Sequence, residues 1–272
     1  QTSARKGPPV PRQMTTMKHS HISPAKEVLL HAVFSGVLLL CMFPGVFLRG
    51  HVIVPGYQLL ESAPWNAYAA QYETASDRYQ PANEYLSQWI NWYSIARHGW
   101  DAGEWPLWNP YQGTGAPLLA NYQTAFFNPV RLPYAVFDVG IGGTISILLK
   151  LYLCGLAAYV YARGIGLRIG GAYILSVAWM LSTLNVTWVY WCSSDVAIWF
   201  PIQLLGIDSL LESRKRRGVV LVSISATMML FAGHPETAFT MGMGAGLYFL
   251  VRLGTQRISG AERAALAGMA LA

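Results

Sequence analysis

Apolar stretches long enough to cross a lipid bilayer recur along this chain, and they constrain its fold more than any other feature. A bilayer core of about 30 Å is spanned by roughly 20 residues of α-helix. Only 12% of the residues are charged, whereas a soluble domain carries about 25%. The sequence therefore predicts an all-α, polytopic transmembrane bundle, with spans at about 28–48, 144–162, 170–190, 196–212, 218–233 and 237–252 and a seventh beginning near 263.

These spans divide the chain into four parts. Residues 1–26 form a basic arm, 27–49 the first span, 50–142 a large loop and 143–272 the rest of the bundle. The last apolar run has only about ten residues before the sequence ends, which is too few to cross a bilayer. We therefore expect the seventh span to be truncated and the natural protein to continue.

Basic residues predict the orientation of the bundle. Lys and Arg near the ends of spans are retained in the cytoplasm, and they gather in the N-terminal arm and near 163–168, 214–217 and 252–263. All of these segments lie on one side if the spans alternate. We expect a cytoplasmic N-terminus and an extracytoplasmic 50–142 loop. The same distribution explains the net charge of +6 without a nucleic-acid partner.

The residues themselves suggest no cofactor motif. The three cysteines are too few and too scattered for a disulfide framework or a metal cluster. The sequence contains no glycine-rich phosphate loop and no nucleophile elbow. Most acidic residues fall on the predicted outer side, so we expect any chemistry to take place there.

The predicted outer loop is rich in Trp, Tyr, Asn, Gln and Pro, which is typical of a segment that packs at the membrane interface. A stretch from 81 to 99 begins with proline, ends with glycine, and has helically spaced apolar residues at Leu86, Trp89, Ile90 and Tyr93. We expect an amphipathic helix that lies on the outer membrane surface.

Two turn-rich segments follow this helix, Trp105–Tyr111 and Gly113–Asn121. Their aromatic rings and amide groups are suited to form the floor of a site for a sugar or a lipid headgroup. The alternative is a re-entrant or interfacial loop that only packs on the bundle.

Lys150 lies inside the second predicted span, where a buried cation is costly unless it finds an anion. One partner is the phosphate of a carrier lipid, with Arg131 or Arg97 assisting through charge-assisted hydrogen bonds. The alternative is a structural pair between Lys150 and a carboxylate of the loop.

His234 and Glu236 flank a proline at the outer end of a span. They are candidates to contact an acceptor, a phosphate or a cation, and the alternative for His234 is a structural hydrogen bond. Asp195 precedes the fourth predicted span, and we expect it to cap that helix.

Several strings of residues are distinctive: Asp77–Pro81, Trp105–Tyr111 and Pro117–Ala125 in the loop, and Trp199–Pro201 and Gly233–Ala238 in the bundle. With Lys150 and Gly155, they make residues 30–252 similar to the bacterial YfhO-like membrane protein family. That resemblance implies a GT-C type glycosyltransferase of the bacterial cytoplasmic membrane. Such enzymes transfer a sugar from a polyprenyl-phosphate carrier to an acceptor outside the membrane.

The resemblance also implies site residues and partners. Asp77 matches the general base that deprotonates the acceptor hydroxyl, and we predict contacts with substrate from Gln80, Trp108, Asn109, Asn121, Gln123, Lys150, His234 and Glu236. The implied partners are membrane lipid, the carrier-linked sugar and a glycopolymer or glycolipid of the cell envelope. A divalent cation is used by some related enzymes, but no ligands for one are evident.

A physical argument for Asp77 is independent of the family. A carboxylate partly desolvated by Trp and Tyr has a raised pKa, and a base tuned toward the working pH is suited to proton abstraction. The alternative is that Asp77 caps the helix near Pro81 or pairs with Arg78. A non-catalytic scaffold that binds lipid or a partner also fits the sequence, and a transporter fits less well because no repeated halves are visible.

Overall fold

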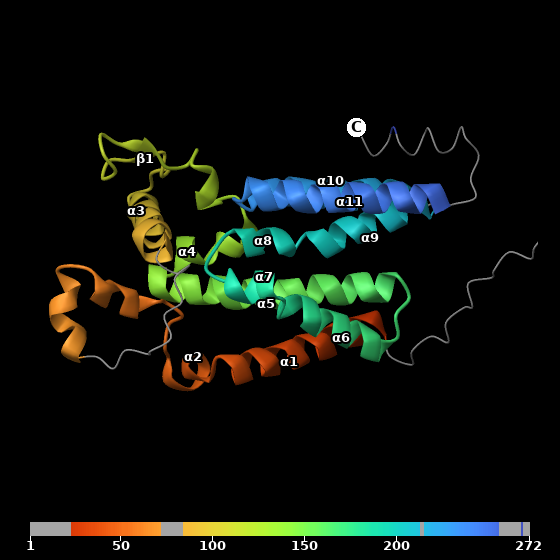
Figure 1. Ribbon diagram of the computed structural model, residues 1–272, viewed down its shortest axis with the longest axis horizontal. Coiled ribbons are helices and arrows are strands. Elements are labelled where there is room, and N and C mark those ends of the chain that lie inside the picture. The colour runs from red at the N-terminus through yellow and green to blue at the C-terminus, as the bar shows by residue number, and fades with distance from the viewer. Residues whose placement is uncertain (1–22, 72–83, 213–214, 256–267, 269–272) are drawn as a thin grey trace, which may run out of the picture.

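The computed structural model describes residues 23–71, 84–212, 215–255 and 268, and these are mostly helical (Figure 1). The strands in this part of the chain are two residues long, β1 (Trp108–Asn109) and β2 (Ala116–Pro117), and form one antiparallel pair. The prediction of an all-α protein is therefore confirmed. The predicted seventh span lies outside the described residues.

Among the described residues, three segments are long and apolar enough to cross a membrane: Ala25–Met42, Val139–Gly164 and Ser193–Leu211. They correspond to α1 (Pro24–Met42), α5 (Val139–Gly164) and the consecutive helices α8 (Ser193–Ala197) and α9 (Phe200–Leu211). The first, second and fourth predicted spans thus have the length and hydropathy that a membrane crossing requires.

The third predicted span is not one continuous helix, and its crossing of a membrane stays a prediction. The segment 170–190 divides into α6 (Ile169–Met180) and α7 (Thr183–Thr187). Ser182 between them is extended, with φ −61° and ψ 153°, and the Asn185 amide donates to the carbonyl oxygen of Trp179 at 2.7 Å. Short polar side chains compete for backbone groups in this way and favour helix ends. At 1.5 Å per residue, α6 is only about 18 Å long.

The fifth and sixth predicted spans are helices with nearly the expected bounds, α10 (Lys215–Phe231) and α11 (Pro235–Thr255). Along α11 an apolar ridge is exposed at Phe239, Met243, Leu247 and Leu250. A large exposed apolar surface indicates contact with lipid or another protein. The total number of spans stays a prediction.

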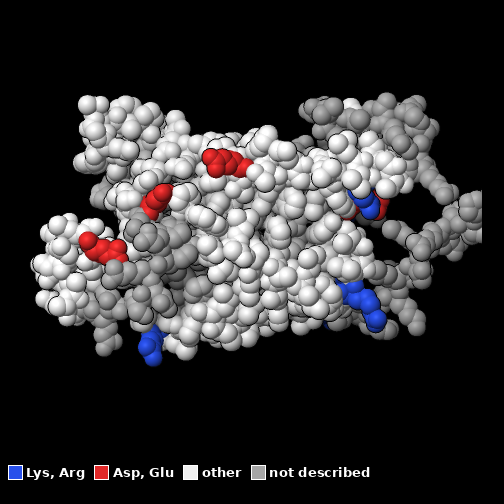
Figure 2. Space-filling view, viewed as in Figure 1, with Lys and Arg blue, Asp and Glu red and all other residues white. Residues whose placement is uncertain are grey.

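The long helices run side by side and divide the molecule into two ends (Figure 1). One end holds the start of α1, the α5–α6 and α9–α10 connections and the end of α11, and we call it the basic end. The other end holds residues 50–71 and 84–138, α7 and the α10–α11 turn, and we call it the aromatic end. In Figure 2 most of the visible acidic surface lies toward the aromatic end.

The chain between α1 and α5 folds into short elements at the aromatic end. They are α2 (Pro44–Arg49), 3-10 turns at Gly56–Glu61, Trp65–Gln71, Tyr122–Thr124 and Pro129–Arg131, a π turn at Tyr85–Trp89 that leads into α3 (Ile90–Asp101), and α4 (Pro133–Val136). The predicted helix at 81–99 is confirmed from Glu84 onward.

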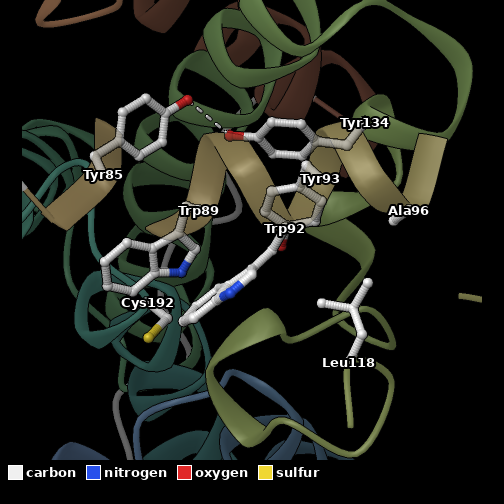
Figure 3. Close-up of a cluster of buried hydrophobic side chains, with 8 residues drawn as sticks. All are labelled: Tyr85, Trp89, Trp92, Tyr93, Ala96, Leu118, Tyr134 and Cys192. Carbon is white, nitrogen blue, oxygen red and sulfur yellow. Dashed lines mark hydrogen bonds between the residues drawn. The ribbon is translucent and has the colours of Figure 1, made fainter. Parts of the chain in front are cut away.

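The aromatic end has its own buried core (Figure 3). It contains side chains from the π turn and α3, from α4 and from the turn before α8, together with Leu118. Trp89 and Tyr93 are fully buried in it, and the Tyr93 ring stacks on Tyr134 at 3.8 Å between centroids. The apolar face of α3 therefore packs against the protein, and the expectation that it faces the outer membrane surface is wrong. Periodicity identifies an apolar face but does not say what covers it.

Candidate functional site at the aromatic end

The hairpin after α3 is held together by backbone hydrogen bonds. In the β1–β2 pair Trp108 lies opposite Pro117 and Asn109 opposite Ala116. The Leu118 amide donates to the carbonyl oxygen of Leu107 at 2.9 Å, and Leu118 is buried in the aromatic core. The hairpin is thereby anchored to the folded end and presents its outer side chains in defined positions.

A groove of about 730 Å³ lies between α3 and this hairpin. Its lining includes His98, Glu104, Trp105, Trp108 and Tyr111. Small-molecule sites in proteins typically enclose 300–1,000 Å³. Trp108 thus lines the groove, and its contact with a substrate stays a prediction.

Gly115 determines the position of the Trp108 ring. Its φ is +100°, which favours glycine, and a Cβ at Gly115 would come within 2.4 Å of Trp108 Nε1. Only a residue without a side chain lets the indole lie this close to the backbone.

Asn109 has a local structural role. Its side chain is buried, and its Oδ1 accepts from the Tyr111 amide at 3.0 Å. This is an Asx turn, which fixes the direction of the chain two residues later. In the structure Asn109 therefore positions Tyr111, and a direct contact with substrate stays a prediction.

Asn121 and Gln123 lie in the segment that joins the hairpin to α4. Asn121 caps a 3-10 turn, since its Oδ1 accepts from the Gln123 amide at 3.2 Å. The carbonyl oxygen of Gln123 accepts from Trp89 Nε1 at 3.2 Å. The same segment touches the α10–α11 turn, where a Cβ on Gly233 would come within 2.9 Å of Ala125.

A buried ion cluster joins this segment to the bundle. Asp195 on α8 pairs with Lys150 Nζ at 2.8 Å and with an Arg131 nitrogen at 2.5 Å. The three side chains are at most 2% exposed. The Asn128 amide also donates to Asp195, at 3.4 Å. The expectation that Asp195 caps a helix is wrong: Cys192 and Trp199 precede α8 and α9, and the Asp195 carboxylate turns inward to the two cations.

Lys150 is fully engaged within the protein. Besides Asp195, its Nζ donates to the carbonyl oxygens of Val189 at 2.7 Å and Trp191 at 2.9 Å and to Ser194 Oγ at 2.9 Å. An ammonium has three protons, so these partners use all of them. The structural pair with a carboxylate is what the structure contains, although the carboxylate comes from α8 and not from the loop.

Burial and charge act in opposite directions on Arg131. Burial alone would lower the pKa of its guanidinium, but the Asp195 carboxylate raises that pKa well above its usual value. Arg131 is therefore a permanent cation in this cluster. Arg97 is not part of it, because Arg97 pairs with Asp101 at 3.0 Å on the exposed side of α3.

A family model described as bacterial membrane protein YfhO matches residues 67–265. The chain belongs to the YfhO family of bacterial membrane proteins. No curated protein matches it, and no solved structure matches it.

In this YfhO family protein, His234 lies at the start of α11. Its Nδ1 accepts from the Thr237 amide at 3.2 Å, so in the neutral ring the proton is on Nε2. His234 also approaches Trp191, with 6.2 Å between ring centroids. Glu236 in the first turn of α11 is exposed. His234 therefore makes a structural hydrogen bond and still has an Nε2 donor on the other side of its ring.

The described site residues form two groups, one around Trp191 and one in the hairpin. The Lys150 ammonium donates to the carbonyl oxygen of Trp191, and the His234 ring approaches the Trp191 ring. The Gln123 carbonyl accepts from Trp89, whose ring lies tilted against that of Trp191 at 5.2 Å between centroids. Asn121 belongs with the first group through its bond to the Gln123 amide, and Glu236 is exposed two positions after His234. Trp108 and Asn109 belong to the hairpin. Asp77 and Gln80 lie outside the described residues.

Contacts between residues that are distant in the chain could not be predicted from local patterns. Asp195 lies more than 60 positions from both Asn128 and Arg131, so no local pattern shows that these side chains meet. His98 and Glu104 of the groove were not singled out, although both stand beside the aromatic string. Among the described residues no group of three or more His, Cys, Asp or Glu is placed to hold a metal ion.

Proposed function

We propose that this YfhO family protein is a glycosyltransferase that moves a sugar from a polyprenyl-phosphate carrier to a cell-envelope acceptor outside the cytoplasmic membrane. The observation that carries the proposal is the open aromatic groove, which lies at the end opposite the basic loops. The positive-inside rule puts those loops in the cytoplasm and the groove outside.

The proposed reaction is a direct displacement at the anomeric carbon. The acceptor hydroxyl oxygen attacks that carbon while the bond to the carrier phosphate oxygen breaks, and the polyprenyl phosphate leaves with the electron pair. Asp77 takes the hydroxyl proton. General-base assistance of this kind contributes roughly 10²–10⁴-fold to the rate.

His234 is the described residue best suited to the carrier phosphate. Its Nδ1 is held as an acceptor by Thr237, so Nε2 carries a proton that it donates to a phosphate oxygen. Lys150 takes part only if Asp195 releases it, because its present partners use all of its protons.

The test is sugar transfer by the full-length protein in liposomes, from radiolabelled polyprenyl-phosphate donors to envelope acceptors. We expect Asp77→Asn to lower transfer by at least 10²-fold without loss of folded protein. Asp101→Asn is the matched control, because Asp101 is an exposed acid of the same loop that pairs with Arg97.

A non-catalytic scaffold is the second candidate, favoured by one observation. The buried cations Lys150 and Arg131 are both occupied by Asp195, as in a structural cluster. Folded wild-type protein that transfers no sugar from any donor would favour this scaffold. Full activity of Asp77→Asn would leave the enzyme in place and remove Asp77 as its base.

A further inference from the structure

The groove beside α3 exposes three aromatic rings on one short segment. Trp105 is 66% exposed, Trp108 53% and Tyr111 82%. Aromatic side chains dominate the energetics of cores and interfaces because each buries a large area. Their joint exposure along one groove therefore indicates a surface that a ligand covers.

Two hydrogen-bond acceptors line the same groove. His98 Nδ1 lies 2.7 Å from the carbonyl oxygen of Ser94, which only accepts, so Nδ1 carries the proton and Nε2 of the neutral ring is an acceptor. Glu104 also lines the groove, and an ionised carboxylate only accepts hydrogen bonds. The groove is thus suited to a ligand that donates hydrogen bonds.

The charge of the groove argues against an anionic ligand. Among the described residues that line it there is no Lys or Arg, and Glu104 is an acid. A phosphate would meet a carboxylate and no permanent cation, which is unfavourable. The phosphate of the carrier is therefore placed elsewhere.

We propose that this groove binds the neutral saccharide of the glycan acceptor. The rings of Trp105, Trp108 and Tyr111 stack against the C–H faces of the sugar, while Glu104 and His98 accept hydrogen bonds from its hydroxyl groups. The assignment to the acceptor rests on the proposed function, but saccharide binding itself does not require transfer.

Two glycines of the hairpin provide a matched pair of variants. Alanine at Gly115 would push against the Trp108 indole, whereas a Cβ at Gly113 meets nothing within 4 Å. Both glycines have positive φ, +100° and +59°, so both substitutions strain the backbone. Only Gly115→Ala displaces the ring.

The experiment is saturation-transfer NMR with the full-length protein in lipid nanodiscs free of sugar detergents. The probes are maltotriose, cellotriose and chitotriose, each tested for binding in the absence of a donor. We expect at least one to bind, with saturation strongest at the C–H protons of the sugar. Trp108→Ala and Gly115→Ala should weaken binding about tenfold, which corresponds to 1.4 kcal/mol, and Gly113→Ala should leave it unchanged.

Three results would overturn the inference. The first is no binding of any of the three saccharides by folded wild-type protein, and the second is equal binding by wild type and Trp108→Ala. The third is quenching of Trp105 and Trp108 fluorescence by bromine-labelled acyl chains, which would make this surface a membrane anchor. Binding without transfer would count against the proposed glycosyltransferase and keep the saccharide site.

Discussion

The ion pairs at the two ends of the molecule differ in stoichiometry and in exposure to solvent. At the basic end Arg163 pairs with Glu27 at 2.9 Å, and these side chains are 26% and 10% exposed. At the aromatic end one carboxylate, Asp195, faces both Lys150 and Arg131, and all three are buried. The first kind of pair ties helix ends together near water, whereas the second joins a loop to two helices inside the protein.

This difference predicts where a mutation does most damage. Breaking a buried pair leaves an unpaired charge and costs about 3–5 kcal/mol, whereas exposed pairs contribute about 0–1 kcal/mol. The buried cluster also holds the segment that carries Asn121 and Gln123, through Arg131 and Asn128. Loss of the cluster should therefore disturb the aromatic end before the bundle.

The largest effect is expected for Asp195→Asn, which leaves two buried cations without their carboxylate. We expect a loss of about 3–5 kcal/mol of unfolding free energy, measured by thermal unfolding of the protein in nanodiscs. Asp208→Asn is the comparison, because its partner Arg252 is 37% exposed at the basic end. An equal loss of unfolding free energy in the two variants would mean that the greater burial of the Asp195 cluster adds nothing to its effect on stability.

Removing either cation of the cluster should have an intermediate effect on stability, and the two effects should differ in size. Lys150→Met removes the donor to the Val189 carbonyl oxygen, and a buried acceptor left unpaired costs about 1–3 kcal/mol. The Trp191 carbonyl oxygen keeps its bond from Ser194 Oγ. Arg131→Met leaves Asp195 paired with Lys150. We expect Lys150→Met to lower the unfolding midpoint more than Arg131→Met. The reverse order would mean that the link to the loop matters more than the bonds within the bundle.

The smallest effect is expected for Glu27→Gln at the basic end. Arg163 keeps its bond to the carbonyl oxygen of Leu167. Its side chain is 26% exposed, so water partly solvates the guanidinium after the Glu27 charge is removed. Because the Glu27 side chain is only 10% exposed and also accepts from Tyr159 at 3.3 Å, the loss of unfolding free energy should lie between that of an exposed pair and that of Asp195→Asn. A loss comparable with that of Asp195→Asn would show that the Glu27–Arg163 pair behaves as a buried one.

Much of the architecture could be predicted because it depends on local composition. Long apolar runs identified α1 and α5, and i, i+3, i+4, i+7 spacing identified the π turn and α3, which contain Trp89 and Tyr93. The break between α6 and α7 was missed, because the 170–190 run is apolar enough to mask the effect of Ser182 and Asn185.

The candidate site was predictable only in part. Trp108 was identified from an aromatic string, and it does line a groove. Asn109 and Asn121 stood out as amides of the same loop, but the structure gives their side chains backbone hydrogen bonds within turns. An amide side chain is equally suited to a turn and to a ligand, so only its neighbours distinguish the two roles.

The sequence by itself determined that the chain is helical, that it belongs in a membrane, and that its Lys and Arg residues gather in a few loops. These properties follow from hydropathy and charge, which are additive along a chain. Tertiary structure alone decided that Asp195 meets Lys150 and Arg131, and that the face of α3 turns into a core. Those pairings join residues far apart in sequence. The packing of the helices against one another determines which buried partners meet.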